Sequence, residues 1–152
     1  MIRYSNHKFK KKKNSNHKYL CYTNLLLIIS ILYFIFNLQK VKDKIIIEYL
    51  LVLFLIITII LSQIFWNNPI KGSTIHKIDA INGKIVILFF IMYTLLYKFK
   101  FSYLLVLFVI SISFYFSDKY SNQEWCCNKH LFWHGLLHVF CFFGTFYAFT
   151  PI

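Results

Sequence analysis

The chain of 152 residues is poor in glycine, proline and acidic residues. Four glycines and two prolines are too few for a collagen-like, disordered or linker-rich chain. Only 14% of the residues are charged whereas 59% are hydrophobic, so the chain lacks the polar surface that a soluble domain needs. Dinucleotide-binding, phosphate-loop and serine-nucleophile-elbow motifs are also absent, so those enzyme classes receive no support. The composition predicts one compact integral membrane domain.

Apolar segments of about twenty residues are what a helix needs to cross a hydrocarbon core about 30 Å thick. The sequence predicts five such helices, at residues 20–38, 45–66, 74–97, 101–116 and 131–149. The fourth is the shortest and follows the third after a short link, so we expect a tight helical hairpin or a re-entrant element there. The predicted fold is all-α, a polytopic transmembrane bundle of about five helices within residues 20–152. No loop is long enough to fold alone, so the function must lie in the helices and their ends.

The N-terminus is strongly basic, with seven of the seventeen lysines and arginines in the first eighteen residues and no acid among them. We expect residues 1–19 to be a disordered cytoplasmic tail that contacts anionic membrane lipids, which is favoured over a nucleic-acid-binding arm. No small-residue cleavage site follows the first apolar segment, so we expect that helix to stay as an anchor. The expected location is an integral, multi-pass one. The sequence leaves the organelle open, although an endomembrane is one option. It also leaves the oligomeric state open.

The cysteines give no sign of a disulfide framework. Cys21 and Cys141 lie in or beside apolar spans, and adjacent cysteines rarely pair with each other. Cys126 and Cys127 lack the CxxC spacing of zinc sites. We therefore expect reduced thiols.

Four polar residues inside the predicted spans require an explanation. Ser62 lies at the end of the second predicted helix, Asp79 near the start of the third, and His134 and His138 in the first two turns of the fifth. Because consecutive helices alternate in direction, these helix ends meet the same leaflet. Ionisable groups at membrane depth are costly and are usually kept for pairing, metal binding or transport. We expect the four side chains to share one depth.

The histidine spacing permits a metal site. His134 and His138 lie one helical turn apart, so their imidazoles can converge on one ion. His130 extends the series, but a rise of about 1.5 Å per residue puts it roughly 12 Å from His138, too far for one zinc ion to bind all three. His76 lies one turn before Asp79 and is a candidate third ligand or a donor to the carboxylate. The competing interpretation is that these histidines only hydrogen-bond neighbouring helices or reach the headgroups.

These residues also carry a family resemblance. Residues 133–138 (WHGLLH), followed by GTFY at 144–147, resemble the last helix of the alkaline ceramidase, adiponectin receptor and Per1 superfamily, called CREST. The run SQIFW at 62–66 and Asp79 resemble that superfamily's second-helix serine motif and third-helix aspartate. The match covers about a third of the chain.

The resemblance implies a zinc ion held by three histidines, water as the nucleophile, and hydrolysis of a lipid amide or related bond. His134 and His138 would be metal ligands, Asp79 would hold the water or act as a ligand, and Ser62 would hydrogen-bond near the water or the substrate carbonyl. His76 is our choice for the third imidazole. The implied cofactor is zinc and the implied partner is a membrane lipid as substrate.

The chain departs from the family pattern in two ways. Trp66 stands where the serine motif places its histidine, so His76, His130 or Asp79 has to complete the ligand shell. The family has seven helices, whereas this sequence predicts five.

Two other functions stay open. In one, the protein is a non-enzymatic multi-pass membrane protein whose polar cluster is structural. In the other, it is a small proton-coupled transporter that uses Asp79 and the histidines as a relay. The sequence has neither internal repeats nor paired broken helices, which disfavours the transporter.

Overall fold

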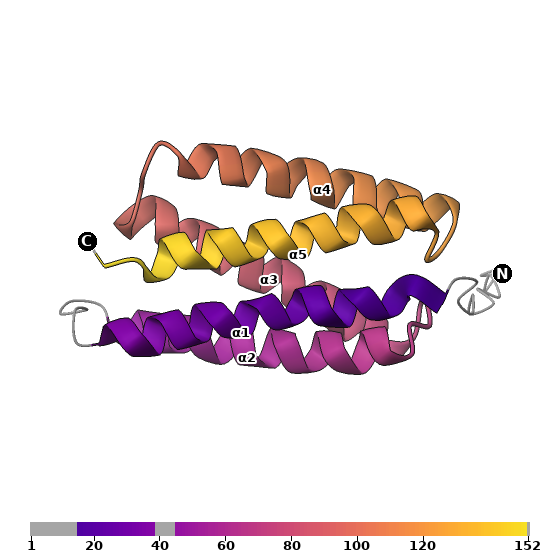
Figure 1. Ribbon diagram of the computed structural model, residues 1–152, viewed down its shortest axis with the longest axis horizontal. Helices are drawn as coiled ribbons and strands as arrows, with labels where there is room; N and C mark the ends of the chain where they lie inside the picture. The colour runs from indigo at the N-terminus through magenta and orange to yellow at the C-terminus, as the bar shows by residue number, and fades with distance from the viewer. Residues whose placement is uncertain (1–14, 39–44, 152) are drawn as a thin grey trace, which may run out of the picture.

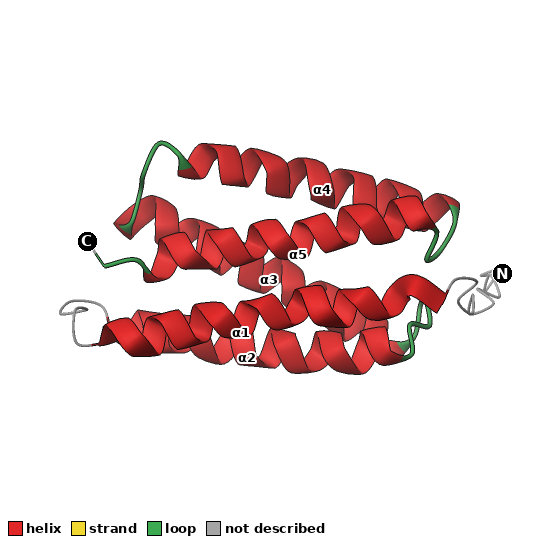
Figure 2. Ribbon diagram, viewed as in Figure 1, coloured by secondary structure: helices red, strands yellow, loops and turns green. Residues whose placement is uncertain are grey.

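The computed structural model of the chain describes residues 15–38 and 45–151, and these residues form a bundle of long helices (Figure 1). A short 3-10 helix, η1 (Ser15–Lys18), precedes five α-helices. These are α1 Tyr19–Asn37, α2 Ile45–Asn67, α3 Thr74–Tyr97, α4 Tyr103–Gln123 and α5 Asn128–Phe149. No strand occurs among the described residues, so the all-α prediction is confirmed (Figure 2). The tail predicted at residues 1–19 lies mostly outside the described residues.

All five helices are long and apolar enough to cross a membrane. Their outer faces carry large apolar side chains, and Phe36, Ile46 and Leu105 are 82%, 73% and 68% exposed. Such faces are unfavourable in water but match the hydrocarbon of a bilayer. The chain is therefore an integral, multi-pass membrane protein.

The fourth helix differs from the prediction. It was expected to end at residue 116, but α4 continues through the polar segment to Gln123 and is a full span. Glu124 then adopts an extended conformation, and α5 begins at Asn128, three residues before its predicted start. Polar residues at the end of a transmembrane helix lie at the headgroups, so they are compatible with helix there.

Helix α5 is central to the bundle, since it packs against α4, α1 and α3, while α2 packs against α1 and α3 (Figure 1). The tight hairpin predicted for the third and fourth helices is not formed. Although a short link joins them, α3 and α4 scarcely touch, and α4 lies along α5 instead. Gly144 lies at this contact, where a Cβ would sit 3.7 Å from Ile110 Cδ1 of α4, an ordinary van der Waals distance. Between α3 and α4 lies a crevice that residues of both helices line, among them Lys84 and Phe114.

Hydrogen bonds between side chains and neighbouring helices reinforce the apolar packing. Asn24 Nδ2 donates to Ile59 O at 3.1 Å and joins α1 to α2. Asn82 Nδ2 donates to Thr58 Oγ1 at 2.8 Å and joins α3 to α2. Such bonds between transmembrane helices contribute about 0.6 kcal/mol each, so they orient the helices more than they stabilise the bundle.

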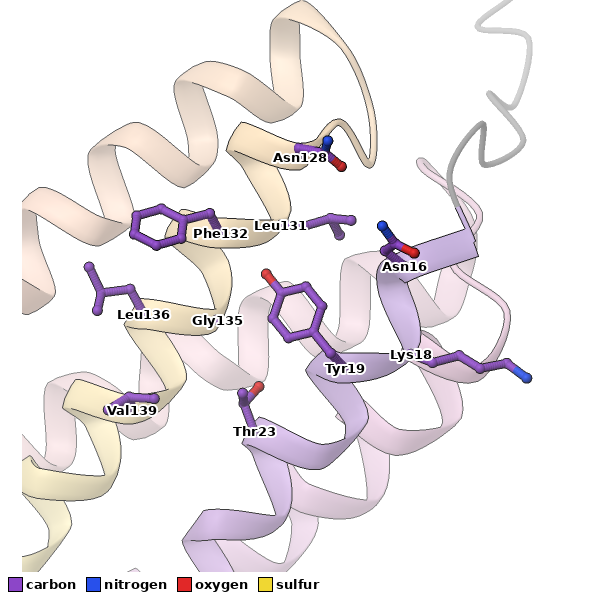
Figure 3. Close-up of a pocket in the computed structure, with 10 residues that line it drawn as sticks. All are labelled: Asn16, Lys18, Tyr19, Thr23, Asn128, Leu131, Phe132, Gly135, Leu136 and Val139. Atoms are coloured by element: carbon purple, nitrogen blue, oxygen red, sulfur yellow. The ribbon is translucent and has the colours of Figure 1, made fainter.

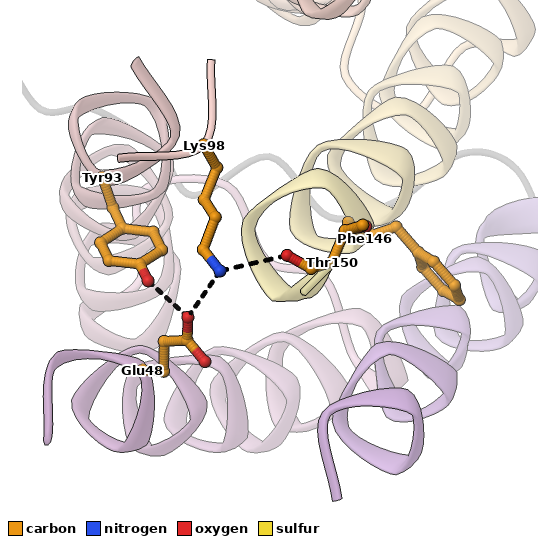
Figure 4. A network of polar contacts seen from close by, with 5 residues as sticks. All are labelled: Glu48, Tyr93, Lys98, Phe146 and Thr150. Carbon is orange, nitrogen blue, oxygen red and sulfur yellow. Dashed lines mark hydrogen bonds and ion pairs between the residues drawn. The ribbon is translucent and has the colours of Figure 1, made fainter. Parts of the chain in front are cut away.

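A buried ion pair fastens the end of the bundle where the C-terminus lies (Figure 4). The Glu48 carboxylate in α2 is fully buried and lies 3.2 Å from the Lys98 ammonium at the end of α3. Tyr93 of α3 donates its hydroxyl hydrogen to the same carboxylate. Lys98 also donates to Thr150 O, at 3.1 Å, just after α5. This network joins the ends of three helices, and the sequence analysis missed it.

Candidate functional site

One cavity, of about 340 Å³, is lined by all five residues that the sequence singled out, namely Ser62, His76, Asp79, His134 and His138. Ser62 lies five residues before the end of α2, and Asp79 five residues after the start of α3. With a rise of about 1.5 Å per residue, both lie roughly 8 Å inside the same end of the bundle. His134 lies at about 9 Å by the same measure and His138, one turn deeper, at about 15 Å. Ser62, Asp79, His134 and His138 therefore lie in a band about 7 Å deep, a little more than one helical turn.

The imidazoles of His134 and His138 are neighbours, with ring centres 4.8 Å apart and planes inclined by 73°. The Nδ1 atom of His138 is 3.0 Å from Thr23 Oγ1 of α1. That hydroxyl donates its hydrogen to Leu20 O at 3.1 Å, so it has to accept from His138. His138 therefore carries its proton on Nδ1 and presents a lone pair on Nε2. A hydroxyl partner on Nδ1 also fixes the orientation of the ring.

His134 has a matching partner on the opposite side. Its Nδ1 atom is 3.0 Å from Ser117 Oγ of α4. If the serine accepts, the Nε2 atom of His134 also presents a lone pair. The two histidines thus connect α5 to both of its flanking helices. Ser117 lies in the stretch that the sequence analysis assigned to a loop.

His76 has a different role in this geometry. It is the third residue of α3, and its Nδ1 atom accepts a hydrogen bond from Gly72 N at 3.2 Å. Its own backbone N–H donates to Ser73 Oγ, also at 3.2 Å. An imidazole that accepts at Nδ1 carries its proton on Nε2 when neutral, so it offers no lone pair at Nε2 to a metal. His76 closes a reciprocal cap at the start of α3.

His130 repeats this cap at the start of α5. Its Nδ1 atom accepts from Cys126 N at 3.2 Å, and its backbone N–H donates to Cys127 Sγ at 3.4 Å. In both caps the preceding residue has a positive φ, 83° at Gly72 and 57° at Cys126. Both caps share one pattern, a serine or cysteine followed three residues later by histidine.

These roles leave two histidines for a metal. Among residues 15–38 and 45–151, no three histidine, cysteine, aspartate or glutamate side chains are close enough together to hold one ion. The donor chemistry of His134 and His138 fits zinc, whereas His76 does not fit as it stands. Asp79 is half-buried at the cavity and forms no ion pair with another described residue.

Trp66 forms an aromatic wall of the cavity. Its ring centre is 4.9 Å from that of His134 and 6.0 Å from that of Trp125, with the two indoles nearly parallel. The indole is 1% exposed, and its Nε1 atom has no hydrogen-bond partner among the described residues. The indole therefore fills the space beside His134 without offering a metal ligand.

The two loops at this end cover the cavity. Lys71, between α2 and α3, donates to Ser121 O and to Asn122 Oδ1 of α4. Trp125, between α4 and α5, donates from Nε1 to Pro69 O at 3.2 Å. Each loop thus holds the other in place over the histidines.

The cavity also contains a cation that the sequence analysis passed over. Lys84 lies in the middle of α3 and lines the cavity, with its Nζ atom 5.7 Å from the ring centre of Phe114 in α4. This contact bridges the crevice between α3 and α4. A lysine inside an apolar span is itself a signal for a functional cavity, and it was available in the sequence.

The four cysteines are free, and Cys141 lines the cavity. Comparisons of the chain with models of protein families, with curated proteins and with solved structures found no match.

Proposed function

We propose that this membrane protein is a zinc-dependent hydrolase that cleaves a lipid amide or a related bond. The observation that carries the proposal is the pairing of His134 and His138 in a cavity that also contains Asp79 and Ser62. Two imidazoles that bind one tetrahedral zinc ion through nitrogens at about 2.1 Å have ring centres about 5 Å apart. The spacing of 4.8 Å agrees with this geometry.

In this proposal, His134 and His138 would hold the zinc ion through Nε2, and water would complete the shell. A zinc ion in this position activates water and polarises a carbonyl group. Asp79 would accept the proton from the attacking water and pass it to the leaving amine, and the Ser62 hydroxyl would donate a hydrogen bond to the substrate carbonyl. The crevice between α3 and α4 gives a lipid a lateral route to these groups.

The topology belongs to the same proposal. The lysines and arginines of the first eighteen residues favour a cytoplasmic N-terminus. The cavity then faces the cytoplasmic leaflet, because it lies at the end of the bundle where α1 begins. The resemblance to the alkaline ceramidase superfamily agrees with a lipid amide as the substrate class.

A structural role is the second candidate. The bonds from His134 to Ser117 and from His138 to Thr23 join three helices without any metal. In that case the cavity residues serve only to align α1, α4 and α5, and the protein acts through partners. Metal content and turnover distinguish the two candidates.

The hydrolase is tested with the full chain in mixed micelles that contain an N-acyl lipid and added zinc, with release of the fatty acid followed by mass spectrometry. We expect Asp79→Asn to lower the rate by about 10² to 10⁴-fold, because the general base is lost. Glu124→Gln, which removes an exposed carboxylate that does not line the cavity, serves as the control and keeps the wild-type rate. Equal rates for Asp79→Asn and wild type would remove Asp79 from the mechanism.

A further inference from the structure

A second hollow lies on the outside of the bundle, between the start of α1 and the first half of α5 (Figure 3). Its volume is about 730 Å³. The groove residues are Asn16, Lys18, Tyr19, Thr23, Asn128, Leu131, Phe132, Gly135, Leu136 and Val139. No acidic side chain of the described residues lines it.

The groove has the dimensions and polarity of one leaflet. Asn16, Lys18 and Asn128 mark its outer end, and Val139 lies eleven residues along α5 from Asn128 (Figure 3). At about 1.5 Å per residue this is roughly 16 Å, close to half of a hydrocarbon core about 30 Å thick. The walls along this length are apolar, and Phe132 is 60% exposed. A lipid therefore fits the groove, with its headgroup at the polar outer end and its acyl chain along the apolar walls.

Tyr19 supplies a polar group at the base of the groove. Its ring lies against Gly135, where a Cβ would come within 2.7 Å of Tyr19 Cε2, so only glycine leaves room for it. The hydroxyl is buried and has no hydrogen-bond partner among the described residues. A buried donor without an acceptor costs about 1–3 kcal/mol, so a lipid oxygen that reached this hydroxyl would be stabilising.

The charge at this end selects the headgroup. Lys18 lines the groove and is exposed, and the start of α5 adds the positive end of its helix dipole. Six further cations precede residue 15 in the sequence. Basic residues next to a membrane surface attract anionic lipids.

We infer that the groove between α1 and α5 binds one anionic glycerophospholipid, with an acyl chain along Phe132, Leu136 and Val139 and the headgroup at Lys18 and Asn128. This site is separate from the cavity, and binding there does not require hydrolytic activity. The two are nevertheless adjacent, because Thr23 lines the groove and also holds His138.

The test uses the delipidated full chain in mild detergent, titrated with phosphatidylglycerol or phosphatidylcholine and followed by native mass spectrometry. We expect one phosphatidylglycerol to bind more tightly than phosphatidylcholine. Lys18→Gln should weaken the binding of phosphatidylglycerol about fivefold, because one basic residue near a membrane surface contributes about that much to the binding of an anionic lipid. The binding of phosphatidylcholine should stay unchanged. Leu136→Trp, which fills the groove, should weaken both lipids at least tenfold.

Two matched controls accompany these variants. Lys100→Gln removes an exposed lysine at the opposite end, and Phe143→Trp enlarges an exposed side chain of α5 outside the groove. Both should bind lipid as the wild type does. Equal affinities for the two lipids in the wild type, or unchanged binding in both Lys18→Gln and Leu136→Trp, would overturn the inference. Zinc content is measured in the same samples, so that failure of the lipid site and failure of the metal site are seen separately.

Discussion

At the scale of single residues, the hydrogen bond on Nδ1 separates the four described histidines of the cavity region into two kinds. His76 and His130 accept from backbone N–H groups and cap helices. His134 and His138 face side-chain hydroxyls, which leaves Nε2 available. Spacing in the sequence cannot make this distinction, because it depends on Ser117 and Thr23, which lie on other helices.

Thr23 gives a direct test of this division. Thr23→Val keeps the shape of the side chain but removes the acceptor for His138 Nδ1–H. We expect zinc affinity to fall by about 10 to 100-fold, as is typical when the group that orients a metal-binding histidine is lost. Thr23→Ser retains the hydroxyl and should stay near wild type. The affinities are measured by competition with a chromophoric chelator, and equal values for Thr23→Val and Thr23→Ser would contradict this role.

At the scale of helices, the caps show how α3 and α5 begin. Ser73 accepts from the His76 backbone at the start of α3, and Pro69 and Gly72 prevent α2 from continuing. The start of α3 was predictable from these residues. The end of α4 was not, because polar residues at a membrane surface fit a loop as well as a helix, and the partner of Ser117 lies on α5.

Ser73→Ala tests the cap. We expect the free energy of unfolding, measured by denaturation from mild detergent into dodecyl sulfate, to fall by about 1 kcal/mol, because one helix N-terminus loses its acceptor. Ser111→Ala is the control, since Ser111 is exposed and bonds only within its own helix, to Leu107 O. A loss in the control as large as that in Ser73→Ala would show that the cap has no special role. Zinc retention should not change in either variant.

The ion pair of Glu48 and Lys98 belongs to the same scale, because it joins helix ends. Glu48→Gln leaves the nearly buried Lys98 ammonium without its counter-charge, so we expect a loss of about 3–5 kcal/mol in the same unfolding assay. The double variant Glu48→Met with Lys98→Met removes both charges and should recover most of that loss. A double variant as unstable as Glu48→Gln would show that the carboxylate acts through Tyr93 rather than through the lysine.

At the scale of the whole molecule, apolar segment length was sufficient to predict five crossings, and alternation of direction placed Ser62, Asp79 and the histidines at one end. The packing order could not be predicted in this way. Chain proximity suggested that the third and fourth helices would pair, yet α4 lies along α5. Glu48 was overlooked because an acid in the first turn of a span resembles an ordinary flanking residue until Lys98 is seen beside it.

The same packing gives the molecule two separate hollows, and each has a chemistry of its own. The inner cavity is lined by His76, Asp79 and Lys84 of α3 and by three histidines of α5. The outer groove is apolar with a basic end.

The most direct test is the zinc content of the full chain, purified in mild detergent after incubation with zinc and removal of the unbound metal. We expect about one zinc ion per chain in the wild type and in His130→Ala, whose histidine caps α5, and almost none in His138→Ala. Folded wild-type protein without zinc, or His138→Ala with the zinc content of the wild type, would contradict the proposed metal centre.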